Sequence, residues 1–506
     1  MKCLGDTGWT RRKFLGTVAA ASAAATLPGA LPAAGGQSGR KPNVLFLMAD
    51  DMRVEIGCYG SWFGARTPHL DALAKTGVRF ERNYCQFPLC NPSRASLLTG
   101  RTPTKTGVLG NRTDFRKEHP DWTTLPQLFK ENGYVTVRAG KIFHGGIDDA
   151  KSWSETVDKG GPTDDGSGPV VGQTKAVHHA GLAGKPGDAL EPLPADKGRA
   201  AYSDRIVVLE GNGEAHGDYH TVDRTIENLR KYQDQPFFIA CGLVKPHSPP
   251  TAPQKFFDWY DVDQIKLTPD FAASPTVPPG FPSAAIRKRN ADLFIGRSAS
   301  EAEAKEVIRA YLASISWADW NLGRVIAELD RLGLREHTII VFVVDHGYQL
   351  GEKGKWSKAG SLFEMGARVP LIMAAPGRNG NGVSCPRMVE SLDIYPTLVE
   401  LCGLPLQKGI AGESLVPWLQ KPQAPRDKPA YTVWSEDGKT LHGVAVRTAE
   451  WRYAEFGPDG SNGAMLFDVH ADPWEMKNLA QDEKYKPVCA ELSALTRKYA
   501  ASLGPA

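Results

Sequence analysis

Four short, unbroken apolar runs along this chain are each followed by polar residues that can take part in chemistry. The runs are Val44–Ala49, Tyr134–Val137, Phe237–Leu243 and Thr338–Val344. Apolar runs of this length, without polar alternation, predict strands that are buried on both faces of a parallel sheet. The polar residues that follow them are Asp50 and Asp51, Lys141, His247, and Asp345 and His346, in the same order. Because ligands bind at the carboxyl ends of the strands in such sheets, we expect these side chains to share one site.

Helical patterns alternate with these runs. We predict helices over residues 69–76, 125–132 and 300–332, and a glycine follows each of them. In the last segment apolar residues recur every three or four positions, which gives the helix one apolar face. Alternating strands and helices predict an α/β layered fold around a mainly parallel central sheet.

The pattern changes after about residue 425. Val444–Arg447 and Trp451–Phe456 are short segments separated by turn residues, and a helical pattern covers residues 484–503. These features predict a small antiparallel sheet with a terminal helix. The chain has 506 residues and is longer than the roughly 250–300 residues at which single cores stop growing. We therefore expect a large α/β domain over residues 37–425 and a smaller α+β subdomain over residues 426–506.

The N-terminal segment has the features of an export signal. Thr10–Leu15 contains a pair of arginines and precedes an alanine-rich apolar run. This arrangement is typical of a twin-arginine signal, which we assign to residues 1–36. The run contains Thr17, Ser22 and Thr26, so it is too weakly apolar for a stable membrane span. We expect the twin-arginine translocase to export the protein to the periplasm or the exterior.

Composition argues against several classes of protein. The net charge is +3, with basic and acidic residues evenly mixed, so no overall field attracts nucleic acid or anionic lipid. The eight cysteines show no Cys-x-x-Cys spacing, which argues against a zinc ribbon and a disulfide scaffold. Cys58 and Cys85 could pair, and the sequence does not decide this.

Two segments, residues 148–201 and 268–283, are rich in glycine or proline and show little periodicity. They predict long surface loops. Such loops either select the substrate or are plain insertions.

The most informative motif is Cys-Asn-Pro-Ser-Arg at residues 90–94, followed by Leu-Leu-Thr-Gly-Arg at residues 97–101. Pro92 suits the first turn of a helix and Gly100 its end, so we expect Cys90 at a helix N-terminus that favours an anion. Alone, the motif could also hold a buried or disulfide-bonded cysteine. It resembles the type I sulfatase signature, in which a separate formylglycine-generating enzyme oxidises the cysteine to Cα-formylglycine (3-oxoalanine). Asn91 stands where that family more often carries a small residue or threonine.

Other motifs strengthen this resemblance. Asp50, Asp51 and Asp345 are hard oxygen donors that suit Ca²⁺ or Mg²⁺. Together with the segments 140–144, 245–247, 345–352 and 355–358, they make the chain similar to the iduronate-2-sulfatase branch of the family, from about residue 42 to residue 480. The resemblance implies an alkaline-phosphatase-like fold.

The resemblance also implies a metal site. One divalent cation, Ca²⁺ in preference to Mg²⁺, would be held by Asp50, Asp51, the modified Cys90, Asp345 and His346. The cation would polarise the sulfate and favour the alkoxide form of the hydrated aldehyde, a gem-diol that is the nucleophile.

The remaining roles concern sulfate binding and proton transfer. Arg94 would hold the modified side chain, while Lys141 and Lys358 would bind sulfate oxygens. His247 would protonate the leaving alcohol as general acid, and His144 would take the proton that releases the product.

These assignments predict a sulfatase that acts on a sulfated uronic acid or a related carbohydrate. Residues 245–247 and 355–358 suggest cationic contacts to a carboxylate beside the sulfate. The alternatives are a choline sulfatase or other small-ester sulfatase, and a phosphonate monoester hydrolase with the same modified cysteine. A non-catalytic sugar-binding protein on the same fold is a further reading. A two-metal phosphatase would need a second ligand set, which we do not find in the sequence.

Overall fold

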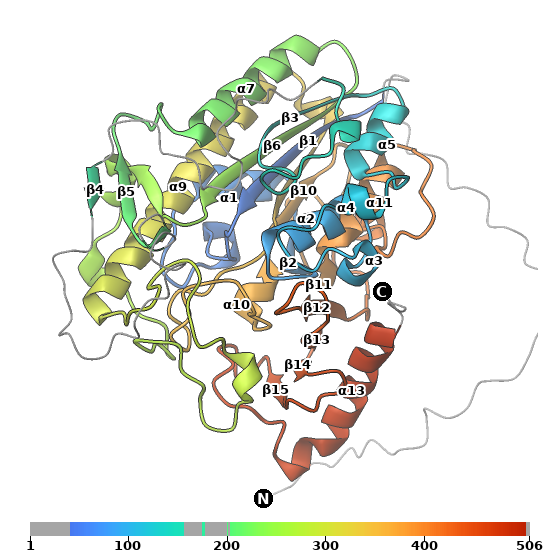
Figure 1. Cartoon of the computed structure of the whole chain (residues 1–506). Coiled ribbons are helices and arrows are strands. Elements are labelled where there is room, and N and C mark those ends of the chain that lie inside the picture. Colours follow the sequence, from blue (N-terminus) through green and yellow to red (C-terminus); the bar gives the residue numbers. More distant parts are fainter. Residues whose placement is uncertain (1–40, 156–174, 178–199, 201–202, 502–506) are drawn as a thin grey trace, which may run out of the picture. The chain divides into compact units, whose positions relative to one another are not determined.

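A mixed sheet of eight strands forms the centre of the protein (Figure 1). In spatial order the strands are β11 (Ser384–Glu390), β2 (Val78–Tyr84), β10 (Leu371–Ala374), β8 (Thr338–Val344), β1 (Asn43–Asp50), β6 (Phe237–Pro246) and β3 (Val135–Gly140), and β9 (Arg368–Val369) pairs with β2. This computed structural model describes residues 41–155, 175–177, 200 and 203–501. The predicted export signal and most of the predicted loop at 148–201 lie outside these residues.

The central sheet is mainly parallel, as the apolar runs predict. β1 runs parallel to β6 and β8, β3 runs parallel to β6, and β11 runs parallel to β2. Only β10 and β9 pair with their neighbours in the antiparallel sense. The sequence did not predict β2 and β11, because charged residues and Pro386 interrupt their apolar pattern.

The side chains of β1 alternate between two cores, one on each face of the sheet. Leu45, Leu47 and Ala49 belong to one core, whose helices are α1 (Pro68–Thr76), α7 (Gly217–Tyr232) and α9 (Glu301–Arg331). Val44, Phe46 and Met48 belong to the other, whose helices are α2 (Cys90–Thr99), α5 (Leu125–Glu131), α11 (Ile394–Leu401) and α12 (Val416–Gln420). Helices on both faces explain why the central strands are apolar throughout. The predicted α/β layered fold is confirmed.

The predicted helices agree with the structure to within one or two residues at each end. α9 begins with a capping box, in which the Ser300 side chain accepts a hydrogen bond from the Glu303 backbone and the Glu303 side chain accepts one from the Ser300 backbone. The short helices are α3 (Pro103–Thr106), α4 (Phe115–Glu118), α8 (Gln254–Phe257) and α10 (Glu364–Ala367). Short 3₁₀ turns are η1 (Gly57–Tyr59), η2 (Ala150–Ser152), η3 (Val262–Gln264), η4 (Ser283–Ala285), η5 (Arg335–His337), η6 (Ser391–Asp393) and η7 (Glu483–Tyr485).

The C-terminal part forms an antiparallel sheet of four strands, as predicted. Its strands are β12 (Ala430–Trp434), β13 (Gly443–Arg447), β14 (Trp451–Phe456) and β15 (Ala464–Asp468), and α13 (Lys486–Ala501) follows them. Apolar side chains of this sheet form one cluster with Phe281, Leu362 and Phe363. A second cluster contains Tyr84 of β2, Met388 of β11 and Ala430 of β12, so the two sheets share a core, and the division at residue 425 stays a prediction.

A small third sheet was not predicted. It consists of β4 (Lys175–Val177), β5 (Ile206–Leu209) and β7 (Thr251–Pro253).

The predicted loop 268–283 lies along residues 351–354, where Lys353 N donates to Asp270 O and Thr276 N donates to Lys353 O. None of the helices in the described part of the chain has the length and apolarity that crossing a membrane requires.

Candidate active site

The polar residues that follow the parallel strands meet at one edge of the central sheet. Asp50 ends β1 and pairs with Pro246 of β6, immediately before His247. On the other side of β1, Ala49 pairs with Val344 of β8, immediately before Asp345. The shared site expected from the apolar runs is therefore present.

Cys90 is the first residue of α2 and is 2% exposed. The helix ends at Gly100, whose φ of 64° lies in the left-handed region that favours glycine. Ser93 Oγ donates to the carbonyl oxygen of Asp345 at 2.5 Å, which holds this helix start against the end of β8. The predicted position at a helix N-terminus is confirmed. The thiols of Cys58 and Cys85 are free, so the disulfide between them that the sequence left undecided is not formed.

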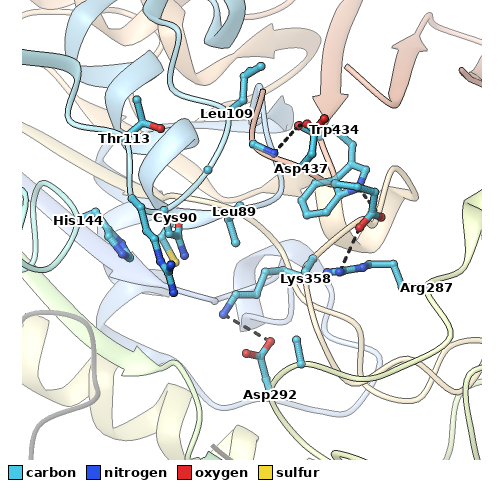
Figure 2. A pocket seen from close by; sticks show the side chains of 18 of the residues that line it. Leu89, Cys90, Leu109, Thr113, His144, Arg287, Asp292, Lys358, Trp434 and Asp437 are labelled. Atoms are coloured by element: carbon cyan, nitrogen blue, oxygen red, sulfur yellow. Dashed lines mark hydrogen bonds and ion pairs between the residues drawn. The ribbon is translucent and has the colours of Figure 1, made fainter. Parts of the chain in front are cut away.

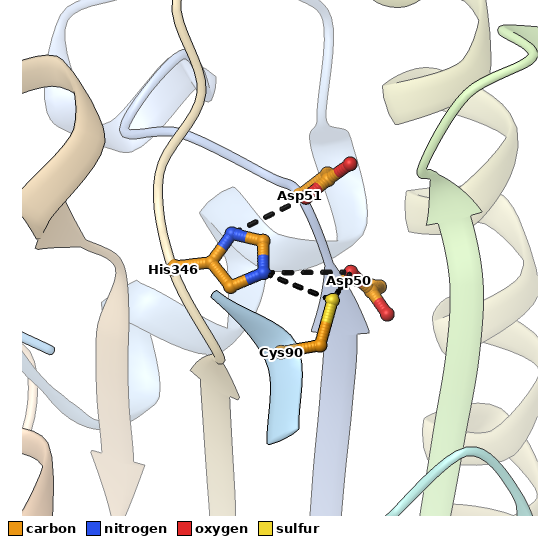
Figure 3. A group of neighbouring side chains, drawn as sticks. All are labelled: Asp50, Asp51, Cys90 and His346. Atoms are coloured by element: carbon orange, nitrogen blue, oxygen red, sulfur yellow. Dashed lines mark hydrogen bonds and ion pairs between the residues drawn. The ribbon is translucent and has the colours of Figure 1, made fainter. Parts of the chain in front are cut away.

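Four side chains form a compact group of metal donors (Figure 3). One donor atom from each of Asp50, Asp51, Cys90 and His346 lies within 4.8 Å of the others. His346 Nε2 lies 3.2 Å from Cys90 Sγ, and His346 Nδ1 lies 3.2 Å from Asp51 Oδ1. In the modified residue, the Cys90 sulfur position would be taken by the oxygens of the hydrated aldehyde. Asp345 lies outside this group, with Oδ2 at 3.4 Å from His346 Nε2.

The electrostatics of this group fit a bound cation. Burial raises the pKa of Asp51 well above its usual value, and Asp51 Oδ1 accepts no hydrogen bond within the described residues. Burial alone would lower the pKa of His346. The nearby Asp345 and Cys90 outweigh this effect and raise the pKa of His346 to about 10. The cluster therefore favours added positive charge, and its oxygen and imidazole donors suit a divalent ion.

Arg94 ties the strand ends together beneath this group and is fully buried. Its Nε donates to Asp345 at 3.0 Å, and its Nη2 donates to Asp50 at 3.2 Å. Its Nη1 donates to the carbonyl oxygens of Lys141 and Ile142 at 2.6 and 3.0 Å. Asp345 Oδ1 accepts in addition from the backbone nitrogens of His346 at 2.9 Å and Asp51 at 3.3 Å. Arg94 therefore holds the strand ends around Cys90, and its role as a support for the modified side chain stays a prediction.

Two buried lysines flank the site. Lys141 Nζ lies 2.5 Å from Asp50 Oδ2, and Lys358 Nζ donates to Asp51 Oδ2 at 2.8 Å and lies 3.5 Å from Asp292. Burial opposes the charged form of both amines, but Asp50 raises the pKa of Lys141, and Asp292 and Asp51 raise that of Lys358. Both side chains are therefore cations that can bind an anion.

His144 and His247 line the same cavity as Cys90, and Figure 2 shows His144 beside Cys90. His247 Nδ1 lies 2.8 Å from the carbonyl oxygen of Ser248, and Nε2 lies 3.8 Å from Asp51 Oδ2. Burial, and then Lys358, lower the pKa of His247 well below its usual value. His247 is therefore neutral near pH 7 unless a bound anion offsets the charge of Lys358. His144 follows β3 and forms an isolated bridge with Ile147.

The cavity has a volume of about 930 Å³. Its inner end holds Cys90, Lys141, His144, His247 and Lys358, and its outer walls come from residues 109–113, residues 287–292 and the turn after β12. Sequence reasoning missed Arg112, Arg287, Asp292 and Trp434, because no predicted strand end or motif marks them. None of the described residues in the two predicted loops, 148–201 and 268–283, lines this cavity.

Two lysines suggested as carboxylate contacts turn into the protein instead. Lys245 Nζ donates to the carbonyl oxygens of His247 and Pro249, and Lys355 Nζ donates to that of Arg289 at 3.1 Å. Both are almost completely buried and neither lines the cavity. A carboxylate in the cavity would have to be bound by other side chains.

Comparison with known proteins assigns the class. Residues 42–404 match the family described as "Sulfatase", and residues 351–501 match the family described as "N-sulphoglucosamine sulphohydrolase, C-terminal". The chain belongs to the sulfatase family and is an enzyme that hydrolyses sulfate esters.

Individual relatives agree with this assignment. The chain is 34% identical to a sulfatase of Formosa agariphila, over 90% of this chain and 87% of the relative. It is 30% identical to iduronate 2-sulfatase of Homo sapiens, over 87% of this chain and 92% of the relative. A structure solved in complex with its substrate D-glucosamine-2-N,6-O-disulfate has a TM-score of 0.68 at 22% identity, and the match covers 92% of this chain and 98% of that one. The alkaline-phosphatase-like fold is confirmed by such neighbours.

Proposed function

We propose that the protein removes sulfate from a sulfated uronic acid or a related sulfated carbohydrate, using a formylglycine made from Cys90 and one divalent cation. The observation that carries this proposal is the position of Cys90. It begins a buried helix, belongs to the group of metal donors, and lines one sugar-sized cavity together with the cationic Lys141 and Lys358.

The residue made from Cys90 would supply the nucleophile, since one hydroxyl of its hydrated aldehyde can attack sulfur and the other allows the sulfate to be released. This chemistry requires a formylglycine-generating enzyme as a partner during maturation. Arg94 would keep the residue in place through its bonds to the ends of β1, β3 and β8.

Asp50, Asp51, residue 90 and His346 would hold the cation, and Asp345 would complete the set or orient it through its contact with His346. We favour Ca²⁺ over Mg²⁺ because Ca²⁺ accepts irregular sets of carboxylate ligands, whereas Mg²⁺ demands a near-ideal octahedron. When bound, the ion would polarise the sulfate and lower the pKa of the attacking hydroxyl.

Lys141 and Lys358 would bind the sulfate oxygens, because both stay protonated on either side of the cluster. His247 would protonate the leaving alcohol. A bound sulfate adds negative charge beside Lys358 and so raises the pKa of His247 toward the range that proton donation requires. His144, on the same cavity, would accept the proton whose loss releases the product.

The choice of a sulfated uronic acid draws support from the relative that is named an iduronate 2-sulfatase and covers most of the chain. Choline sulfate or another small ester is the main alternative substrate. A phosphonate monoester is the alternative that shares the modified cysteine.

Export through the twin-arginine route is part of this proposal. It rests on the arginine pair and the apolar run of residues 1–36. Twin-arginine export carries folded proteins, so Cys90 would be modified in the cytoplasm, before the protein reaches the periplasm or the exterior.

The test is the mass of the tryptic peptide from Asn83 to Arg94, taken from protein made together with a formylglycine-generating enzyme. Conversion of the Cys90 thiol to an aldehyde, together with faster turnover of sulfate esters than of phosphonate esters, would support the proposal. An unmodified thiol in an active preparation would overturn the mechanism, and faster phosphonate turnover would overturn the substrate class.

A further inference from the structure

The outer wall of the cavity contains an arginine that the proposed chemistry does not use. Arg112 lines the cavity and is exposed. Within the described part of the chain its guanidinium has no ion-pair or hydrogen-bond partner. Arg287, in contrast, lies 3.1 Å from Glu436 and stacks over Trp434, with its guanidinium 5.6 Å from the ring centroid (Figure 2).

Glu436 and Asp437, the two acidic residues in the turn after β12, already have partners. Trp434 Nε1 donates to Glu436 at 2.8 Å, in addition to the Arg287 pair. Asp437 accepts from the backbone nitrogens of Lys439 and Thr440, both at 2.8 Å. Neither carboxylate is bound to Arg112, so its charge is available to a ligand in the cavity.

The loop that carries Arg112 is fastened to the residue after Cys90. Asn91 is 4% exposed, and its Nδ2 donates to the carbonyl oxygens of Gly110 at 2.9 Å and Thr113 at 2.8 Å. Its backbone nitrogen donates to Asn111 Oδ1 at 3.1 Å. These three bonds hold residues 110–113 against the start of α2. Asn91 is also the position at which the signature departs from the more common small residue or threonine, neither of which offers an amide with two donors.

We infer that Arg112, positioned by Asn91, binds a second anionic group of the substrate, a carboxylate or a second sulfate, while the scissile sulfate lies at Cys90. This rests on the proposed function and adds the residue that selects the substrate. A guanidinium held in place by its loop can bind either group through two parallel hydrogen bonds. Lys439 also lines the cavity, from the exposed turn between β12 and β13, whose Gly438 packs against Gly110.

The test uses two pairs of substrates, each differing in one charge. The first pair is 4-methylumbelliferyl iduronide 2-sulfate and its carboxyl methyl ester, and the second is the 6-sulfates of N-sulfo and N-acetyl glucosaminides. The measured quantity is the ratio of kcat/KM for the charged member to that for the neutral member, for the full chain with aldehyde at residue 90. We expect a ratio of about ten or more in one pair, which identifies the second group as carboxylate or sulfate. Arg112→Gln should reduce this ratio to near one, a loss of about 1.4 kcal/mol.

Arg224→Gln is the matched control. Arg224 is exposed on α7, lies outside the cavity lining and has no partner within the described residues. Its substitution removes the same charge, so an equal fall in the ratio would show a general field effect and overturn the inference.

Asn91→Thr tests whether Asn91 positions Arg112, since threonine is one of the residues that the signature carries more often at this position. We expect a lower ratio, mainly through a higher KM for the charged substrate, with the aldehyde content of residue 90 unchanged by mass. In the Arg112→Gln background the same change should have no further effect on the ratio. An additive effect in the double variant would contradict positioning through Arg112.

A wild-type ratio near one in both pairs, or a ratio unchanged by Arg112→Gln, would overturn the inference and leave the proposed sulfatase function standing. Failure to hydrolyse any sulfate ester, with aldehyde present at residue 90, would overturn both.

Discussion

At the scale of single residues, the site is a set of buried ionisable groups, of which Asp50, Lys141 and Lys358 are kept ionised by their neighbours. Burial alone would raise the pKa of Asp50, but Lys141 and Arg94 hold it well below its usual value. Removing one member of such a set leaves an unpaired buried charge, which costs several kcal/mol. Individual substitutions here should therefore affect stability as well as activity.

Arg94→Lys is expected to remove most activity and to destabilise the protein by about 3 kcal/mol or more. One ammonium group cannot replace the bonds that Arg94 donates to Asp50, Asp345 and two carbonyl oxygens. Urea unfolding and kcat on one sulfate ester measure the two effects. Arg224→Gln, on the surface of α7, should change neither, and a fully stable Arg94→Lys enzyme would contradict the bridging role.

The effect of His247→Ala on kcat should depend on the leaving group of the ester. If His247 protonates the leaving oxygen, its loss should reduce kcat about 10²–10⁴-fold for a sugar sulfate, but far less for p-nitrophenyl sulfate, whose phenolate needs no proton. His144→Ala should instead slow product release, so that a burst of alcohol precedes a slow steady state. His220→Ala, exposed on α7, is the control. Equal losses on both esters would exclude His247 as the general acid.

At the scale of elements, the site depends on how the C-terminal sheet joins the central one. Glu364, at the start of α10, is bound by Arg452 of β14 at 2.5 Å and lies 3.4 Å from Arg447 of β13. α10 also places Met365 and Gly366, whose carbonyl oxygens accept from Tyr348 N and Gly347 N just after His346. One short helix therefore supports both the loop of the metal site and the sheet whose turn walls the cavity.

Glu364→Gln is expected to destabilise the protein by about 3 kcal/mol at pH 7, because it leaves the buried Arg447 without its carboxylate and the buried Arg452 with Glu475 alone. Burial would raise the pKa of Glu364, but Arg452 and Arg447 outweigh it and hold the pKa far below its usual range. A lowered folded-state pKa stabilises the protein above the unfolded value of about 4.3, and this contribution is lost as the pH falls further. Urea unfolding at several pH values should show the two proteins converging below about pH 4.

Glu483→Gln is the control for this prediction. Glu483 forms a surface pair with Lys486, and its side chain is 81% exposed. Its loss should cost less than about 1 kcal/mol. A difference between wild type and Glu364→Gln that does not shrink in acid would contradict the ionised pairing.

At the scale of the whole molecule, metal binding should couple activity to stability. The donors come from the end of β1, the start of α2 and the loop after β8, so a bound ion links three separate parts of the chain. An ion that binds only the folded protein stabilises it by about 2.7 kcal/mol at a hundredfold excess over Kd.

Removal of divalent ions with a chelator should therefore lower both Tm and activity, and Ca²⁺ alone should restore both. Thermal unfolding by circular dichroism reports the first effect independently of turnover. Asp51→Asn should abolish the rise in Tm on adding Ca²⁺. A Tm that does not respond to the chelator or to Ca²⁺ would contradict a metal site in this cluster.

Much of the fold and part of the site could be predicted because their signals are local. The apolar runs of β1 and β8 mark strands buried on both faces, and the acidic residues that follow them mark the edge where a site forms. β2, β10 and β11 were missed, because charged residues or proline interrupt the apolar patterns of β2 and β11 and β10 has only 4 residues.

The sequence by itself determined the class of chemistry. The signature at residues 90–94 and the polar residues that follow each apolar run are short, continuous segments that can be read without the fold. Only the tertiary structure decided which side chains face the substrate. It turned Lys245 and Lys355 toward backbone carbonyls and brought Arg112, Arg287 and Trp434 to the cavity from three distant segments. The physical reason is that a side chain's direction depends on packing between elements. No local pattern of hydrophobic and polar residues records such packing.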